Sequence, residues 1–164
     1  MEILFQIANN IKNLSQGKIL FSTLSDNPQL KKMVIQLNTA IQLRSEHIDS
    51  NGNELFSQYH QSSVYSKTTE ILSGGRKIAG TPYTLFDTGE FFKSFEIILD
   101  VNGFEINADP IKNGDSFGGT NLFEEYGEDI LGLTDKNMTI FINALLPKIQ
   151  NVVIKQILKG TWIV

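Results

Sequence analysis

The dipeptide Asn102-Gly103 restricts the fold more than any other feature of this chain. Asn-Gly tolerates the positive φ angles of a type I′ turn better than other dipeptides do, and strand-like segments flank it, Phe91–Asp100 and Phe104–Asp109. Apolar residues alternate along the first segment: Phe95, Ile97 and Leu99. Because alternate side chains of a strand share one face, these residues require burial. The sequence predicts an antiparallel hairpin over about residues 94–109, packed against helices.

Three stretches carry apolar residues at helical spacing. The first is a short amphipathic segment from Ile3 that ends near Gly17. The second begins at Asn27-Pro28, where a capping residue precedes a proline suited to the first turn, and runs to about His47. The third begins at Thr134 or Asp135, contains Pro147 and stops near Gly160. Since an internal proline removes a helical hydrogen bond, we expect Pro147 to kink or split this region.

Together these patterns predict an α+β fold, in which a small antiparallel sheet packs against several helices and a long kinked helical region closes the chain. A length of 164 residues suits one domain. We divide it into a helical part of about residues 1–64, an α+β part of about residues 65–159 and an apolar tail, residues 160–164. The turn formers of residues 49–53 predict little ordered structure after the second helix.

Composition narrows the classes of function. The chain has no cysteine, which excludes disulfides and thiolate chemistry. Its formal net charge of −4 gives no support to general binding of phosphate backbones. No apolar run is long enough for a membrane span, and the first residues lack the pattern of an export signal. We therefore expect a soluble protein that makes no membrane contact.

Most of the acidic residues that attract attention lie between Asn113 and Asp135, a segment without Lys or Arg: Asp115, Glu124, Glu125, Glu128 and Asp129. Paired carboxylates can divide general acid and base work. Neighbouring acids in a polar segment are more often a solvated face, and the two histidines, His47 and His60, have no partner at metal-ligand spacing. We therefore predict no catalytic, metal or cofactor site.

Three further features have a structural and a functional interpretation. Residues 73–82 contain Arg76 and Lys77 between glycines and predict a mobile basic loop, with contact to nucleic acid or an acidic partner as the minority interpretation. Four phenylalanines favour core packing over a ligand pocket: Phe86, Phe91, Phe92 and Phe95. The tail residues Trp162, Ile163 and Val164 either fold back or dock onto another subunit.

Two blocks of sequence resemble the tail-completion and head-to-tail joining proteins of tailed bacteriophages. The first block comprises Tyr65-Ser66-Lys67-Thr68-Thr69, the glycine-rich basic loop and Leu85-Phe86-Asp87-Thr88-Gly89-Glu90-Phe91-Phe92-Lys93-Ser94-Phe95. The second comprises Leu122-Phe123-Glu124-Glu125-Tyr126-Gly127 and Ile130-Leu131-Gly132-Leu133-Thr134-Asp135-Lys136-Asn137. The resemblance covers Tyr65–Lys159 and includes the order of the elements. The family's His-Gln pair and Pro-Ala-Arg segment are replaced here.

The resemblance implies a structural protein of the virion and not an enzyme. The chain would form a homo-oligomeric ring in the neck or tail, contact neighbouring phage neck and tail proteins and let genome DNA pass without sequence-specific binding. Assembly would take place in the cytoplasm of the bacterial host. The acidic residues and the Trp162 tail become candidate lumen or interface contacts. A monomeric binding module and a carboxylate-dependent hydrolase, which requires Glu124 or Glu125 to face another acid across a cleft, are the alternatives.

Overall fold

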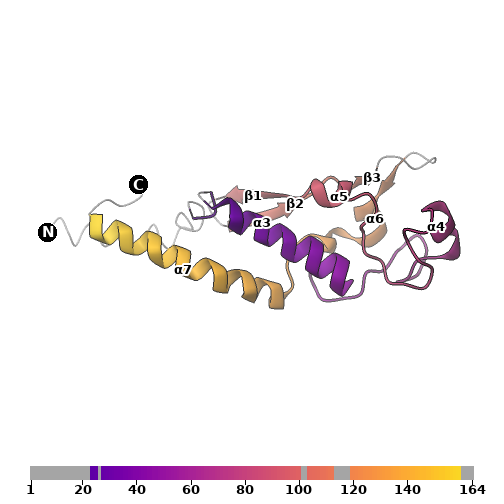
Figure 1. Cartoon of the computed structure of the whole chain (residues 1–164), viewed down its shortest axis with the longest axis horizontal. Helices are drawn as coiled ribbons and strands as arrows, with labels where there is room; N and C mark the ends of the chain where they lie inside the picture. The colour runs from indigo at the N-terminus through magenta and orange to yellow at the C-terminus, as the bar shows by residue number, and fades with distance from the viewer. Residues whose placement is uncertain (1–22, 26, 101–102, 113–118, 160–164) are drawn as a thin grey trace.

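The structure is a computed structural model that describes residues 23–25, 27–100, 103–112 and 119–159. The molecule is elongated (Figure 1), with the long helices α3 and α7 along one side and the β-hairpin against them. Helix α4 lies at one end of the molecule, and the C-terminal half of α7 extends toward the other end. The predicted helix from Ile3 to Gly17 lies outside the described residues. The α+β fold class is confirmed.

The predicted helix from Pro28 to about His47 is confirmed as one continuous helical segment. Helix α3 (Pro28–Gln36) starts with the expected proline and continues directly into the π-helical segment η1 (Leu37–Glu46). His47 ends it in the left-handed conformation at φ 60°. The His47 ring also lies within hydrogen-bond distance of the Tyr83 carbonyl, with Nδ1 3.2 Å from that oxygen. The helix end is therefore tied to the middle of the chain.

The hairpin is confirmed, with a shift in its boundaries. Strand β1 (Glu96–Asp100) pairs antiparallel with β2 (Gly103–Asn107), and Asp100 lies opposite Gly103. Gly103 therefore begins β2 and does not occupy the turn, which the sequence pattern had placed one residue later. Residues before β1 also differ from the expected strand, because Glu90–Lys93 form the short helix α5. Gly89, at φ 83°, precedes α5 and supplies the backbone conformation that its start requires.

Shorter elements fill the rest of the α+β part. Helix α4 (Lys67–Leu72) is followed by the basic loop, and a second two-stranded sheet joins β3 (Ile111–Lys112) to β4 (Thr120–Asn121). Helix α6 (Leu122–Tyr126) and a 3-10 turn, η2 (Glu128–Ile130), lead to the closing helix. The sequence pattern did not predict the second sheet, because strands of two residues carry no alternating pattern to detect.

The closing helix α7 (Asp135–Lys159) begins where the sequence predicts. The Thr134 hydroxyl accepts a hydrogen bond from the Asn137 amide, which caps the first turn. Pro147 lies inside the helix and does not split it, and the helix bends by 40°. The expected kinked helical region is therefore confirmed. Phe141 and Leu145 lie on its buried face, against the core.

The segment after His47 is irregular in outline and held by defined hydrogen bonds. The Asp49 carboxylate accepts from the amides of Asn51 and Asn53, and Ile48 bridges to Glu54. The Ser50 amide donates to the Asp129 carbonyl, which connects this turn to η2. The prediction of little ordered structure after Asp49 was therefore wrong. It assumed that turn formers leave a chain unpaired, whereas an Asx turn pairs the backbone through a side chain.

Buried amides hold the start of α7 against η1. Asn38 Nδ2 donates to the Ile130 carbonyl, and the Asn38 Oδ1 atom accepts from the Gly132 amide. Gln42 Nε2 donates to the Gly132 carbonyl at 3.0 Å, and its Oε1 accepts from the Thr134 amide at 2.9 Å. We call Asn38, Gln42 and residues 130–134 the amide clamp. The side chains of Asn38 and Gln42 are fully buried. Their hydrogen bonds to the backbone are therefore made away from solvent.

Gly132 is the position in the amide clamp that tolerates a side chain least. Its φ of +113° disfavours any L-residue, and an added Cβ would lie 3.0 Å from Ser50 Cβ. We expect Gly132→Ala to lower the free energy of unfolding by about 2–4 kcal/mol. The matched control is Gly52→Ala, at φ +82° with open space around it, which should cost about 1–2 kcal/mol. Equal losses in urea denaturation would contradict the close contact with Ser50.

Removing the Gln42 amide tests the clamp itself. Gln42→Leu replaces the amide with an apolar side chain of similar size, and it leaves the Gly132 carbonyl and the Thr134 amide without their partner. We expect a loss of about 2–4 kcal/mol in the free energy of unfolding. Gln36→Leu, at an exposed position of the same helix, should change stability by less than about 0.5 kcal/mol. A comparable loss in both variants would show that the effect belongs to the helix and not to the clamp.

Candidate functional site

The predicted acidic cluster divides into one buried and three exposed carboxylates. Glu125 is buried, whereas Glu124, Glu128 and Asp129 are exposed. Glu124 and Glu125 differ in burial because both lie on helix α6, where neighbouring residues point in different directions. The expectation of a solvated face is therefore correct for three of these residues and wrong for Glu125. Asp115 lies outside the described residues.

Glu125 is held inside the subunit by a polar network. Its Oε1 accepts a hydrogen bond of 2.7 Å from the Ser57 hydroxyl, and its backbone carbonyl accepts from the Gln58 amide. The exposed His60 ring places Nε2 3.9 Å from the same Oε1. The Ser57 hydroxyl and the His60 ring both face the Glu125 carboxylate, and the hydroxyl donates its hydrogen bond to that carboxylate and not to the imidazole. This arrangement therefore differs from the Ser-His relay that activates a nucleophilic serine. The network connects residues 57–62 to α6.

Three tyrosines line the inner side of this network. The rings of Tyr65, Tyr83 and Tyr126 pack edge to face, with centroids 4.8 and 5.3 Å apart. Burial raises the pKa of the Tyr126 hydroxyl far above its ordinary value, and the adjacent Glu125 carboxylate raises that pKa further. Burial likewise raises the pKa of Tyr83. The protonated forms of the Tyr83 and Tyr126 hydroxyls are therefore favoured in the folded protein.

Two of the exposed acids, Glu124 and Asp129, border a surface pocket of about 330 Å³ between the loop after η1 and helix α6. Its walls include acidic and aromatic side chains, among them Asp49, Glu54, Phe56, Phe123, Glu124 and Asp129. No Lys or Arg is among the residues that line it. We call this feature the acidic pocket. Glu124 is fixed at its edge by the Tyr59 hydroxyl at 3.0 Å and by Asn121 Nδ2 at 3.0 Å.

The basic loop is connected to the motif Asp87-Thr88-Gly89. Arg76 Nε lies 2.8 Å from Asp87 Oδ1, and Lys77 Nζ lies 3.5 Å from Asp87 Oδ2. Further hydrogen bonds join Tyr65 to Thr81 and to Gly80 through the backbone. Both predicted cations therefore have an acidic partner in the same subunit, and the mobility of the loop stays a prediction. Arg76 is the more accessible of the two, with 57% of its side chain exposed against 14% for Lys77.

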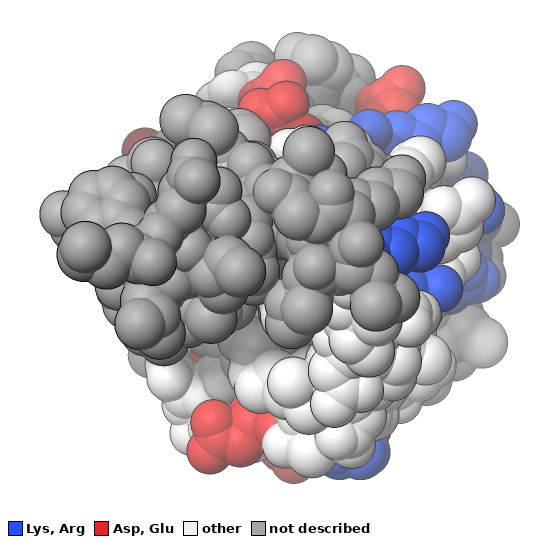
Figure 2. Space-filling model, turned by 90° about the vertical axis from the view of Figure 1, so that its left-hand side faces the viewer, with Lys and Arg blue, Asp and Glu red and all other residues white. Residues whose placement is uncertain are grey.

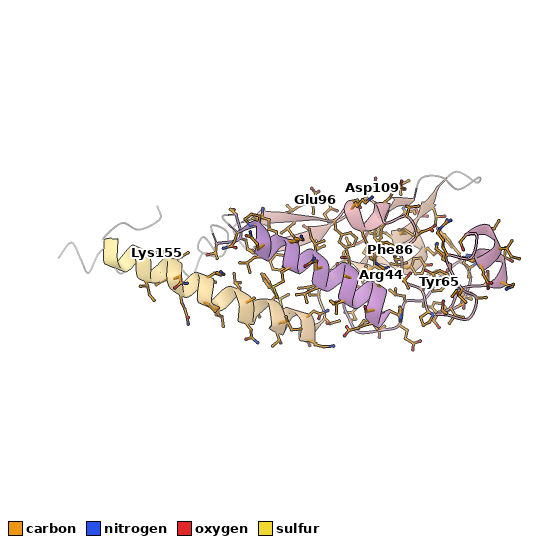
Figure 3. All side chains as sticks on the ribbon, in the orientation of Figure 1. Arg44, Tyr65, Phe86, Glu96, Asp109 and Lys155 are labelled. Atoms are coloured by element: carbon orange, nitrogen blue, oxygen red, sulfur yellow. The ribbon has the colours of Figure 1, made fainter. Side chains whose placement is uncertain are left out.

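The four phenylalanines pack as the core interpretation predicts. Phe95 is buried, Phe91 and Phe92 pack against the core, and the three rings contact one another. Phe86 contacts Phe92 on one side. The Arg44 guanidinium from η1 lies 3.9 Å from the centroid of the Phe86 ring, and Figure 3 shows the two side chains next to each other. This cation–π contact holds the Asp87 motif to the long helix.

Charge is distributed unevenly over the surface. Figure 2 shows the end of the molecule opposite α4, where most Lys and Arg side chains gather on one flank and Asp and Glu lie above and below them. A net charge of −4 therefore does not describe a uniformly acidic surface. Within the described ranges, no group of three or more His, Asp or Glu residues is arranged to hold a metal ion.

Some residues near the candidate site were not predicted from the sequence, and some predicted residues lie outside the described ranges. The sequence pattern gave no reason to select Asp49, Glu54 or Ser57, because residues 49–58 contain no motif and their partners in α6 lie about 70 residues further along the chain. Trp162, Ile163 and Val164 lie outside the described residues. Among the helices that the structure describes, none has the length and apolar character needed to cross a membrane.

Comparison of the chain with protein-family models, with curated proteins and with solved structures finds no match. The resemblance of residues 65–159 to phage tail-completion proteins accordingly stays a prediction from the motifs and from their order along the chain.

The raised pKa of Tyr126 predicts a loss of stability at alkaline pH. In the unfolded chain the hydroxyl ionises near pH 10, whereas in the folded protein it keeps its proton. Unfolding above pH 10 therefore releases a proton, and stability falls by up to about 1.4 kcal/mol per pH unit. We expect Tyr126→Phe to show a shallower fall than wild type between pH 10 and 12 in urea titrations. Parallel profiles for wild type and Tyr126→Phe would contradict the prediction.

Proposed function

We propose that this chain is a ring-forming structural subunit of a tailed-bacteriophage virion, placed in the neck or tail, where it joins head and tail. The proposal includes passage of genome DNA through the ring without sequence-specific binding, contacts with neighbouring neck and tail proteins, and assembly in the host cytoplasm. It assigns no catalytic role and no cofactor to the chain.

One observation carries the proposal: the motif residues of both blocks stand where helices begin. In the first block the Ser66 hydroxyl accepts from the Thr69 amide and caps α4, and Gly89 precedes α5, which leads into the hairpin. In the second block Gly132 is held by the amide clamp, and Thr134 caps α7. These motif residues thus set the starts of three helices, which supports a structural role for the motifs.

Exposed apolar side chains support assembly. Ile71 and Leu72 on α4 are 69% and 79% exposed, and Ile78 in the basic loop is 59% exposed. Apolar side chains of this exposure, close together in the chain, favour a surface that another protein covers. A closed ring uses contacts between unlike patches of neighbouring subunits, and an elongated subunit with an apolar end suits such contacts.

Three of the predicted acidic residues suit the lining of a DNA passage. Glu124, Glu128 and Asp129 are exposed and would repel the phosphate backbone, which favours sliding over binding. Glu125 is left out of this lumen proposal because it is buried and bonded to Ser57. The same pairing argues against Glu125 as one acid of a hydrolase, since it faces a serine hydroxyl and not another carboxylate. A ring structure with the three exposed acids on its outer wall would contradict the lumen proposal.

We expect the purified full chain to form one discrete homo-oligomer of several subunits in size-exclusion chromatography with light scattering, and electron microscopy should show it as a ring. Deletion of residues 161–164 should shift this oligomer toward smaller species, because the apolar tail is the proposed contact with a neighbour. An unchanged mass would remove the tail from the interface. A monomer at all accessible concentrations would contradict the ring and favour the monomeric binding module.

A further inference from the structure

We infer that the ring contact is made by the α4 end of one subunit and the acidic pocket of the next. This inference rests on the proposed ring and names the two surfaces of its main contact. The first, which we call the apolar tip, consists of Ile71, Leu72, Arg76 and Ile78. The second is the acidic pocket between the loop after η1 and α6. This contact places Glu124 and Asp129 between subunits and not in the lumen, so that among the described acids of the cluster the lumen proposal keeps Glu128.

The apolar tip is the most exposed apolar surface of the described residues. Leu72 and Ile71 have larger exposed fractions than any other large apolar side chain that the structure describes. Figure 1 places α4 at the extreme end of the elongated molecule, where it can reach a neighbour without a clash between the two bodies. Arg76 follows α4 in the chain by four residues, and its side chain is 57% exposed, with its Nε–H on Asp87.

The acidic pocket complements the tip in chemistry and in size. Phe56 and Phe123 provide apolar wall, and Asp49, Glu54, Glu124 and Asp129 provide negative charge without a lining Lys or Arg. A volume of about 330 Å³ lies at the small end of the range of about 300–1,000 Å³ for ligand pockets, which suits one or two protruding side chains. A guanidinium binds carboxylates through parallel N–H donors, so Arg76 would find its match at the rim.

The tip and the pocket belong to different subunits in this arrangement. None of the residues that line the pocket comes from α4 or from the basic loop, so the tip of a subunit does not fill its own pocket. A contact between two unlike patches leaves one free tip and one free pocket on every dimer. Such a contact therefore continues either to a closed ring or to an open chain of subunits, whereas a contact between two like tips would stop at two subunits.

Cysteine cross-linking tests the contact directly, because the chain has no native cysteine. Thr68 is exposed on α4, one turn before the apolar tip, and Gln58 is exposed at the pocket. Mixed Thr68→Cys and Gln58→Cys proteins should form a disulfide-linked dimer containing one copy of each, at least about tenfold faster than Thr68→Cys with Glu105→Cys on the hairpin. Equal rates for the two mixtures, or faster pairing of Thr68→Cys with itself, would overturn the inference.

Complementation by mixing provides a second measurement. The double variants Ile71→Asp/Leu72→Asp and Glu124→Lys/Asp129→Lys each lose one surface and keep the other, so each should be monomeric alone. All four positions are exposed, and circular dichroism should show unchanged folding. An equimolar mixture should give a species of two subunits and nothing larger, because one good tip meets one good pocket. Variants that still assemble alone would overturn the inference.

The outcomes separate this inference from the proposed function. If wild type forms a ring but the Thr68→Cys and Gln58→Cys variants do not cross-link, the contact is refuted and the proposed ring subunit is not. If the two variants cross-link but wild type forms only open chains of subunits, the contact is supported and the ring is refuted. If wild type is monomeric and the two variants do not cross-link, both are refuted.

Discussion

The fold depends on a small set of hydrogen bonds between the helix 28–46 and the turn that starts the closing helix. Asn38 and Gln42 are fully buried, and each bonds to backbone groups of residues 130–134 at both its amide nitrogen and its amide oxygen. A buried amide is tolerated only when it is satisfied. The pairing therefore fixes the register of two helices that apolar contacts alone would allow to slide. Gly132 makes the approach possible, because a side chain there would meet Ser50.

The same constraint explains why the motifs of the chain carry structural information. Ser66, Gly89 and Thr134 begin helices, and Asp87 pairs with Arg76 and Lys77. Each of these residues acts on the backbone or on a neighbouring loop and not on a ligand. The surfaces proposed for partners use other side chains, on α4 and in the basic loop and around the acidic pocket. The residues that begin helices and the residues of the proposed contacts are thus different, although both lie within or beside the two motif blocks.

Local signals predicted the elements that depend on neighbours in sequence. Pro28, Thr134 and the alternation of Phe95, Ile97 and Leu99 marked two helices and the hairpin, since caps and periodicity act over a few residues. The sequence did not reveal the burial of Glu125, because Glu124 beside it is equally acidic and only the approach of Ser57 distinguishes them. Likewise, the sequence did not reveal the role of Asn38 and Gln42, because they lie in a helix with an ordinary amphipathic pattern. Their partners lie 90 or more residues away, where periodicity carries no information.

The amide clamp also bears on how the protein is made. Asn38 bonds to Ile130 across 92 residues of chain, and Asn137 donates to the Leu37 carbonyl across 100. During synthesis the helix 28–46 emerges long before these partners, so its buried amides and the apolar face beside them stay open until the closing helix leaves the ribosome. Contacts of this separation slow folding. A nascent chain consequently cannot reach its final shape, or offer a finished surface to another copy, before nearly all of it has been translated.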